Sequence, residues 1–469
     1  MRILNPNTKN VTEVIAGADR KALELRHLFG STGKQEMIRR LTLASLMAFS
    51  LNGVAADLQQ LYEQASQHDP QILAARANRD AGKEAEPLAR ANLLPNVSAS
   101  GNLNYTNQDI KKSLSVTGED DFSSNSLALN VTQPLFRRDR TVALEQAREQ
   151  VKQADANYLF AEQDLMVRLA QAYFGVLSAE ENLTFAEAEK KAIERQLDQA
   201  KERFEVGLVA ITDVHEAQAR YDQSNANVIS ARNDVDNTLE VLREIVPDAP
   251  SALDDLKEDL PLVGPEPRVI DSWAQTAQEN NPQIASARFN TEIARKSIEV
   301  QRSGHYPSLD LVGSLTRARS NATTGTDADT GAIGLQLAVP IYSGGGVTSA
   351  TRQARFQFEA AQEELDQTRR GVARQVRDAY RGIETSISRV GALNATVRSA
   401  MSALEATEAG FEAGTRTLVD VLNSQSALFL ARRDFAQARY DYVVNTLRLL
   451  QAAGTLSDED IVRVNGWLQ

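Results

Sequence analysis

The sequence predicts an α+β membrane protein that combines a long antiparallel α-helical coiled coil with four transmembrane β-strands per chain. Three observations lead to this fold class. A pattern of residues recurs about 207 positions along the chain, four segments alternate apolar and polar residues, and two long proline-poor stretches carry a seven-residue apolar stripe. The repeat is weighed first, because self-similarity at a fixed period means that one structural unit is used more than once.

The repeat is clearest in the segments 204–218 and 411–425. The first has Phe204, Gly207, Ile211, Asp213, Val214 and Gln218, and the second has Phe411, Gly414, Leu418, Asp420, Val421 and Gln425. We therefore predict two equivalent halves, each read as helix, strand, loop, strand, very long helix, tight turn and helix. The first repeat spans 57–246, a proline-rich and acidic linker spans 247–267, the second repeat spans 268–456, and a C-terminal tail follows at 457–469.

The segment 37–56 has the layout of a secretory signal peptide. Arg39 and Arg40 precede an apolar stretch at 41–51, and small residues follow at Val54, Ala55 and Ala56. The apolar stretch is shorter than the roughly 20 residues that a transmembrane helix needs. A signal peptide normally starts a chain, so residues 1–36 are interpreted as an over-extended start, with a natural N-terminal extension as the alternative. The signal predicts export.

The four strands are predicted from strict alternation. Apolar and polar side chains alternate from Asn96 to Tyr105, from Leu127 to Thr132, from Ser308 to Leu315 and from Ile333 to Pro340. A period of two with one apolar face indicates a half-buried sheet, which soluble sandwiches also show. Lengths of about 9 to 11 residues match tilted transmembrane strands. The polar segments at about 107–123 and 317–330 are expected to be the hairpin loops.

The stretch from Arg140 to Val206 is predicted to be one long helix. Steps of seven from Leu144 meet apolar residues throughout, and the corresponding stripe of the second half starts at Phe358. Such a stripe favours a left-handed coiled coil. At about 1.5 Å per residue the helix would reach roughly 100 Å. The alternative is a periplasmic coiled-coil adaptor or scaffold without a pore, which has no need for four strands with one lipid-compatible face.

Four strands leave two open sheet edges, and unpaired backbone groups in lipid cost several kcal/mol each. The smallest closed barrels use about eight strands. Several copies must therefore pool their strands, and this argument alone leaves the number of copies open.

Composition excludes several other functions. The chain has 469 residues, a net charge of −12 and no cysteine. An acidic chain is unsuited to binding nucleic acid. The four histidines, His27, His68, His215 and His305, are scattered, and the segment 343–346 lacks the lysine of a phosphate-binding loop. We expect no enzyme activity, no catalytic residue, no metal and no cofactor.

The segments Gly207–Val214 and Gly414–Leu422 resemble the TolC family of bacterial outer-membrane efflux proteins, and the resemblance covers Asp57 to about Leu456. They are closer to the TolC branch than to the lipidated multidrug channels, whose N-terminal cysteine is missing here. The resemblance implies a homotrimer with a twelve-stranded barrel in outer-membrane lipid and a helical tunnel across the periplasm. It further implies a passive exit duct for efflux or type I secretion, partnered by a periplasmic adaptor and an inner-membrane transporter. The exported substrate stays open.

The resemblance also implies functional residues at the helical tips. Thr212 and Asp213 would lie on the outer helix pair of a periplasmic gate, Phe411 and Arg416 on the inner pair, and Asp420 at the constriction, where it favours cations. Two positions depart from the family pattern: Phe411 replaces a tyrosine, and Asn423 replaces a second acidic residue. An Arg416–Asp213 pair is a hypothesis for closure. Adaptor docking is expected at the two turns, Val206, Gly207 and Leu208 in the first and Ala413, Gly414 and Thr415 in the second.

Overall fold

The computed structural model describes residues 57–111, 118–250, 252–322, 325 and 327–469. The predicted signal peptide and the segment 1–36 lie outside this range. The elements before the linker are α3 (Leu58–His68), α4 (Pro70–Lys83), α5 (Ala85–Ala91), β1 (Asn96–Ile110), β2 (Gly118–Phe136), α6 (Arg138–Glu205) and α7 (Ile211–Ile245). Those after it are α8 (Ile270–Asn280), α9 (Pro282–Arg302), η1 (Ser303–His305), β3 (Ser308–Ser320), β4 (Asp327–Ala338), α10 (Gly346–Glu412), α11 (Leu418–Ala453) and α12 (Asp458–Asn465).

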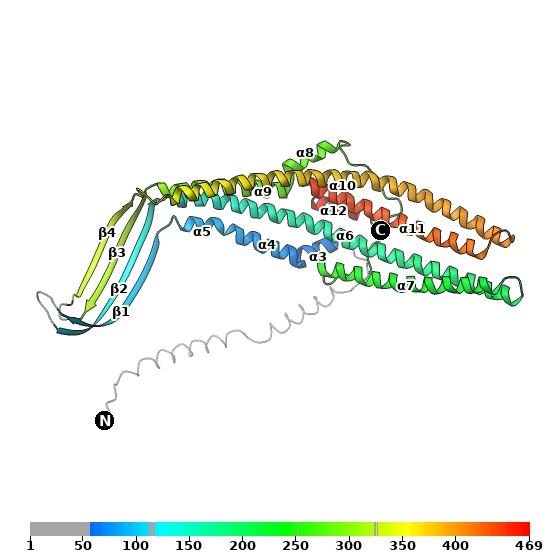
Figure 1. Ribbon diagram of the computed structural model, residues 1–469, viewed down its shortest axis with the longest axis horizontal. Coiled ribbons are helices and arrows are strands. Elements are labelled where there is room, and N and C mark those ends of the chain that lie inside the picture. The colour runs from blue at the N-terminus through cyan, green and yellow to red at the C-terminus, as the bar shows by residue number, and fades with distance from the viewer. Residues whose placement is uncertain (1–56, 112–117, 251, 323–324, 326) are drawn as a thin grey trace, which may run out of the picture. The chain divides into compact units, whose positions relative to one another are not determined.

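The two long helices form as predicted. Helix α6 has 68 residues and α10 has 67, and each returns through a tight turn into α7 or α11 (Figure 1). Helix α9 packs against both α6 and α10, while α4 and α5 pack against α6. The two hairpins, α6/α7 and α10/α11, run from the sheet at one end of α6 and α10 to the turns at the other (Figure 1).

The helical segment before each pair of strands is broken, and the sequence explains where. Asp69 caps α4 by accepting a hydrogen bond from the Ile72 amide at 3.0 Å, and Pro70 occupies the first helical position. Asn281 and Pro282 repeat this arrangement at the start of α9. Proline lacks an amide hydrogen and suits the first turn of a helix, so α3 ends before α4 and α8 before α9.

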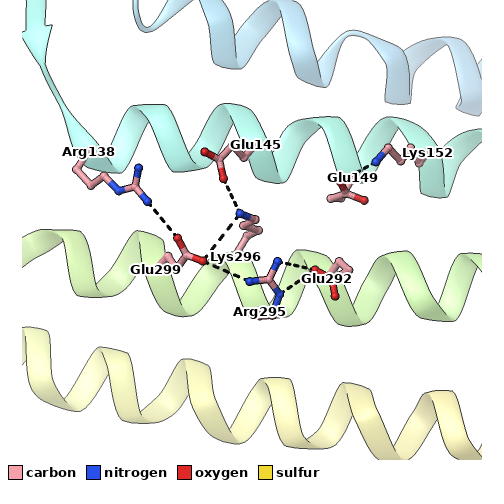
Figure 2. Close-up of polar contacts among 8 residues, drawn as sticks. All are labelled: Arg138, Glu145, Glu149, Lys152, Glu292, Arg295, Lys296 and Glu299. Carbon is pink, nitrogen blue, oxygen red and sulfur yellow. Dashed lines mark hydrogen bonds and ion pairs between the residues drawn. The ribbon is translucent and has the colours of Figure 1, made fainter.

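A network of ion pairs joins α6 to α9 near the sheet (Figure 2). Arg138 of α6 contacts Glu299 of α9 at 3.3 Å, and Glu145 of α6 contacts Lys296 at 2.5 Å. Lys296 hydrogen-bonds to the Glu145 carboxylate and lowers its pKa. Exposed pairs of this kind contribute about 0–1 kcal/mol each. Both pairs join α6 to α9, so together they favour the alignment in which Arg138 faces Glu299 and Glu145 faces Lys296.

The strands form one antiparallel sheet in the order β1-β2-β3-β4. They have 15, 19, 13 and 12 residues, longer than predicted. Pairing continues through the polar residues that were expected to be loops, for example from Asn107 opposite Asp121 to Ile110 opposite Gly118. The difference arises because ladder hydrogen bonds are made by the backbone, whereas the prediction followed apolar side chains.

The two faces of the sheet differ in chemistry and in exposure. Exposure alternates along β2 and β3, and the odd-numbered residues are the more exposed. We call this the apolar face; its strongly exposed members include Val97, Leu103, Leu127, Leu315, Ile333, Leu335 and Leu337. The opposite face carries Ser, Asn and Thr. Where β3 begins, the Asp310 carboxylate accepts two hydrogen bonds from Arg137, at 3.0 and 2.6 Å, which ties the sheet to the start of α6.

The main apolar core lies along the middle of the helices. Tyr173 and Phe174 of α6 are buried there with Leu449 of α11. Residues 246–250 and 252–269 and the C-terminal tail pack against this core, and a bridge between Leu256 and Leu468 joins them. The tail contains α12, which the sequence analysis did not anticipate.

In the part of the chain that is described, no helix combines the length and the apolar character that crossing a membrane requires.

Candidate functional site

The two hairpin turns have the same backbone. In the α6/α7 turn the Leu208 amide donates to the Arg203 carbonyl at 2.8 Å and the Gly207 amide to the Phe204 carbonyl at 2.9 Å. In the α10/α11 turn Thr415 and Gly414 make the equivalent bonds to Gly410 and Phe411, at 2.8 and 3.1 Å. Gly207 and Gly414 have φ values of 75° and 74°, a left-handed conformation that favours glycine. Both helices thus end in a Schellman motif.

The side chains of the α6/α7 turn are apolar and exposed. Val206 is 69% exposed and Leu208 is 74% exposed, and Ile211, at the start of α7, is exposed as well. Ala210 precedes α7 and has no side chain able to cap it. This turn therefore presents apolar surface and uncapped amide groups together, which is unusual for a surface that meets only water.

The α10/α11 turn is polar and satisfies its own groups. The Thr415 hydroxyl donates to the Gly410 carbonyl at 3.0 Å. Thr417 and Asp420 form a capping box: the Asp420 carboxylate accepts from the Thr417 amide and hydroxyl, both at 2.9 Å, and the Asp420 amide donates back at 3.3 Å. The Thr417 amide, its hydroxyl and the nearby Arg416 charge lower the pKa of Asp420. Asp420 thus caps α11, and its lowered pKa favours the charged carboxylate, which is compatible with the role at the constriction that the resemblance implies.

An apolar cluster joins the two hairpins close to their turns. We call it the tip cluster; its buried members are Ile193, Leu197 and Ala200 of α6, Ala217 of α7, and Leu418 and Leu422 of α11. Phe411 packs against it from α10, partly buried. Because residues of both hairpins fill one cluster, separating the hairpins would expose apolar surface to water.

Two polar contacts reinforce the tip cluster. Arg220 of α7 donates to the Asn423 side-chain oxygen of α11 at 2.8 Å. The Arg203 guanidinium of α6 lies 4.7 Å from the centre of the Phe411 ring, a cation–π geometry. The two residues that depart from the family pattern are therefore those that bind arginines of the other hairpin. Sequence reasoning missed Arg203 and Arg220, because both lie among alternating charges on helices and nothing distinguishes them from solvated residues.

The remaining predicted gate residues are close to the turns but do not pair with one another. Thr212 and Asp213 lie in the first turn of α7, and Arg416 is exposed beside Thr417. Between described residues, no ion pair or hydrogen bond connects Arg416 to Asp213. Nor do the described residues contain a group of three or more histidine, aspartate or glutamate side chains able to hold a metal ion.

A four-stranded sheet with one exposed apolar face, at one end of two long helical hairpins, defines the class of α-helical channel proteins of the outer membrane. The chain belongs to the outer membrane efflux protein family, whose model matches residues 61–246 and 273–455. The unmatched residues between the two regions, 247–272, contain the whole of the predicted linker 247–267.

Individual relatives agree. The chain is 41% identical over 422 residues to the outer membrane protein TolC of Vibrio cholerae, covering 88% of this chain and 94% of that protein. It is 30% identical over 447 residues to the proteases secretion protein PrtF of Dickeya chrysanthemi, covering 92% and 96%. The outer membrane channel CmeC of Campylobacter jejuni has the same fold, with a TM-score of 0.74 at 17% identity over 88% of this chain and 90% of that one.

These findings confirm the predicted fold of the chain, its location in the outer membrane and its function as an exit channel for efflux and secretion. They argue against the alternative of an adaptor or scaffold without a pore. The relatives are channel proteins rather than enzymes.

Proposed function

We propose that three copies of this chain form one exit duct, closed at the hairpin turns until a periplasmic adaptor docks there and an inner-membrane transporter delivers the substrate. The equivalent halves 57–246 and 268–456, joined by 247–267, would give each copy two similar hairpins. The observation that carries the proposal is the open-edged sheet with its apolar face.

The sheet supports assembly because its ends are unsatisfied. Within the described strands, β1 pairs only with β2 and β4 only with β3. Since directions alternate from β1 to β4, the β4 edge of one copy and the β1 edge of the next are antiparallel, so copies can continue the ladder. Closure removes both edges, which lipid would otherwise make costly. Three copies supply twelve strands and space for a channel, whereas two supply only enough to enclose packed side chains.

The tip cluster supports a gate. Each copy holds its α10/α11 hairpin against α6/α7 through apolar contacts, the Arg220–Asn423 hydrogen bond and the Arg203–Phe411 contact. An exposed polar link contributes at most about 1 kcal/mol. Because three copies would open together, their sum of about 3 kcal/mol corresponds to roughly a hundredfold in the opening equilibrium. Docking of a partner could therefore open the duct by a modest bias at each turn.

The two turns support docking of an adaptor. Val206 and Leu208 offer apolar contacts, while Gly207 and Gly414 let a partner approach the backbone closely. Similarity to a protease secretion protein favours proteins among the exported substrates, and similarity to TolC leaves smaller molecules open.

Single-channel recording of the purified protein in planar bilayers tests the proposal, together with its mass in detergent. We expect a trimer of low conductance, and we expect Arg220→Ala and Arg203→Ala, each made alone, to raise the open fraction by up to about a hundredfold. Arg232→Ala is the matched control, because the partner of Arg232 among the described residues is Glu187, inside the α6/α7 hairpin. A monomer, or equal effects of the control and the gate variants, would contradict the proposal.

A further inference from the structure

Two arginines lie on the apolar face of the sheet, toward its hairpin loops. Arg317 of β3 stands opposite Asp329 of β4, and Arg319 stands opposite Asp327. The Nε atom of each arginine lies near a carboxylate oxygen of its partner, at 3.4 and 3.2 Å. On the other side of β3, Arg317 stands opposite Leu127 of β2 and Arg319 stands opposite Asn125. Charged side chains thus directly follow the apolar rows on this face, and polar residues such as Ser123 and Asp121 of β2 continue it toward the hairpin loops.

The rows place these charges at the edge of the apolar band. From Leu309 to Arg317 a strand advances about 26 Å at about 3.3 Å per residue. With a tilt of about 40° this is roughly 20 Å of depth, and Arg319 lies at roughly 25 Å, the height of the lipid-facing band of an outer-membrane sheet. The helices lie at the opposite end of the sheet (Figure 1). The arginines therefore mark the boundary of the leaflet on the hairpin-loop side.

The guanidinium groups retain donors for a further ligand. Each arginine faces its aspartate through Nε, and the two side chains are 56% and 51% exposed. Among the described residues nothing hydrogen-bonds to the terminal nitrogens of either one. Two neighbouring nitrogens of a guanidinium match two oxygens of a phosphate, which is why arginine is favoured for phosphate recognition.

An apolar groove lies directly below the arginines. It has a volume of about 520 Å³ and is lined mainly by Ala99, Leu127, Leu129 and Leu315, with Gly331 at its edge and the Arg317–Asp329 pair at its upper end. Ala99, Leu129, Leu315 and Gly331 form one row across the four strands. Ala99 leaves space beside Leu127 and Leu129 at one end of this row, whereas the Leu315 side chain lies over Gly331 at the other. The groove suits a hydrocarbon chain, and the charges above it suit the head group of the same molecule.

We propose that Arg317, Arg319 and this groove bind one phosphate-bearing, acylated lipid of the outer leaflet, with its phosphate on the two guanidinium groups and an acyl chain in the groove. The inference rests on the proposed function in one respect, since the apolar face must meet the membrane. Asp327 and Asp329 then orient the arginines through Nε and limit the net charge near the hydrocarbon boundary.

Two pairs of substitutions separate a lipid site from a purely structural pair of ion bridges. A structural ion pair is lost when either partner is replaced. If the pairs are only structural, lipid retention should therefore change equally in Arg317→Gln with Arg319→Gln and in Asp327→Asn with Asp329→Asn. A phosphate site is lost only when the arginines go, because removing the carboxylates frees donors. Ala99→Leu fills the groove and leaves all four charges in place.

The probe is bis-phosphorylated lipid A, added to the delipidated, detergent-purified protein and counted by native mass spectrometry, with dephosphorylated lipid A and inorganic phosphate as separate arms. We expect Arg317→Gln with Arg319→Gln to lower retention of the phosphorylated lipid at least tenfold. The variant with both aspartates replaced should retain as much as the parent, and Ala99→Leu should retain less of either lipid. Equal losses of lipid in the variant without the two arginines and the variant without the two aspartates would overturn the site. Equal retention of phosphorylated and dephosphorylated lipid A by the parent protein would overturn it as well. Binding of inorganic phosphate as tight as that of the lipid would overturn the role of the groove.

Membrane fractionation and channel conductance, measured on the same preparations, distinguish a failure of the proposed function from a failure of the lipid site. If the parent protein fails to fractionate with the outer membrane or forms no channel, the proposed function fails. If it does both but retains lipid independently of Arg317 and Arg319, only the lipid site fails.

Discussion

The two hairpin turns have the same backbone conformation and differ in almost every side chain. Each ends its long helix with a Schellman motif around a left-handed glycine, Gly207 or Gly414. The α6/α7 turn then exposes Val206 and Leu208 and leaves the start of α7 without a side-chain cap. The α10/α11 turn exposes polar groups and caps α11 with Thr417 and Asp420.

This difference separates two tasks that two turns with the same backbone conformation would otherwise perform identically. The apolar, uncapped turn is suited to contact with another protein, which would cover Leu208 and occupy the free amides. The polar, capped turn is suited to remaining in water beside a narrow passage, with a fixed negative charge at Asp420. We infer that the backbone of the turn comes from the repeat, whereas its role comes from a few side chains.

The largest expected effect comes from placing a charge on the apolar turn. We expect Leu208→Asp to lower adaptor-dependent export at least tenfold, because a carboxylate would be buried without a partner when the adaptor docks. Thr415→Asp is the matched change in the polar turn and should lower export much less. Export rate and crosslinking to the adaptor measure both. Leu208 is exposed, so the stability of the folded protein should not change, and equal losses of export in the two variants would refute the division of tasks.

Exchanging the caps sharpens the comparison. Thr417→Ala removes the capping box and should destabilise the first turn of α11 by about 1 kcal/mol, whereas Ala210→Ser should stabilise the first turn of α7 by a similar amount. Amide hydrogen exchange at these two turns measures the opposite changes. If Ala210→Ser also weakens docking, the free amides of α7 belong to the contact with the partner; faster exchange in α7 of that variant would contradict the account.

The smallest expected effect is the change in cation preference as the pH is lowered. The hydrogen bond from the Thr417 amide is the largest cause of the lowered pKa of Asp420. A group with a lowered pKa in the folded state contributes stability above its ordinary pKa, and this contribution is lost as the pH falls through the lowered value. Preference for cations should therefore persist at the pH where an ordinary aspartate is half protonated, and disappear only below it. Reversal potentials measured from neutral pH downward test this, and Asp420→Asn should show little preference at any pH.

Much of the fold was predictable because its signals are periodic. The stripe from Leu144 predicted α6 almost to its ends, and alternation from Asn96 predicted β1. The outer ends of the strands were missed because polar residues continue the ladder there. Helix α12 was missed because its eight residues are held by tertiary contacts with α3 and the core rather than by a long periodic pattern.

The site was predictable only in part. Gly207, Gly414 and Asp420 belong to local motifs, and local motifs can be recognised within a few residues of sequence. The contacts of Arg220 with Asn423 and of Arg203 with Phe411 join residues about 200 positions apart. No local pattern encodes such a pair, and the Arg416–Asp213 pair, which also joins distant residues, stays a hypothesis.

Tethering the two hairpins tests the gate most directly. The chain has no cysteine, so Arg220→Cys with Asn423→Cys supplies the only two thiols, which a short bismaleimide can join. We expect the crosslinked channel to remain at low conductance when the adaptor is added, while the untreated double variant opens. If the crosslinked protein opens as readily as the untreated one, the hairpins do not separate when the duct opens, and the gate lies elsewhere.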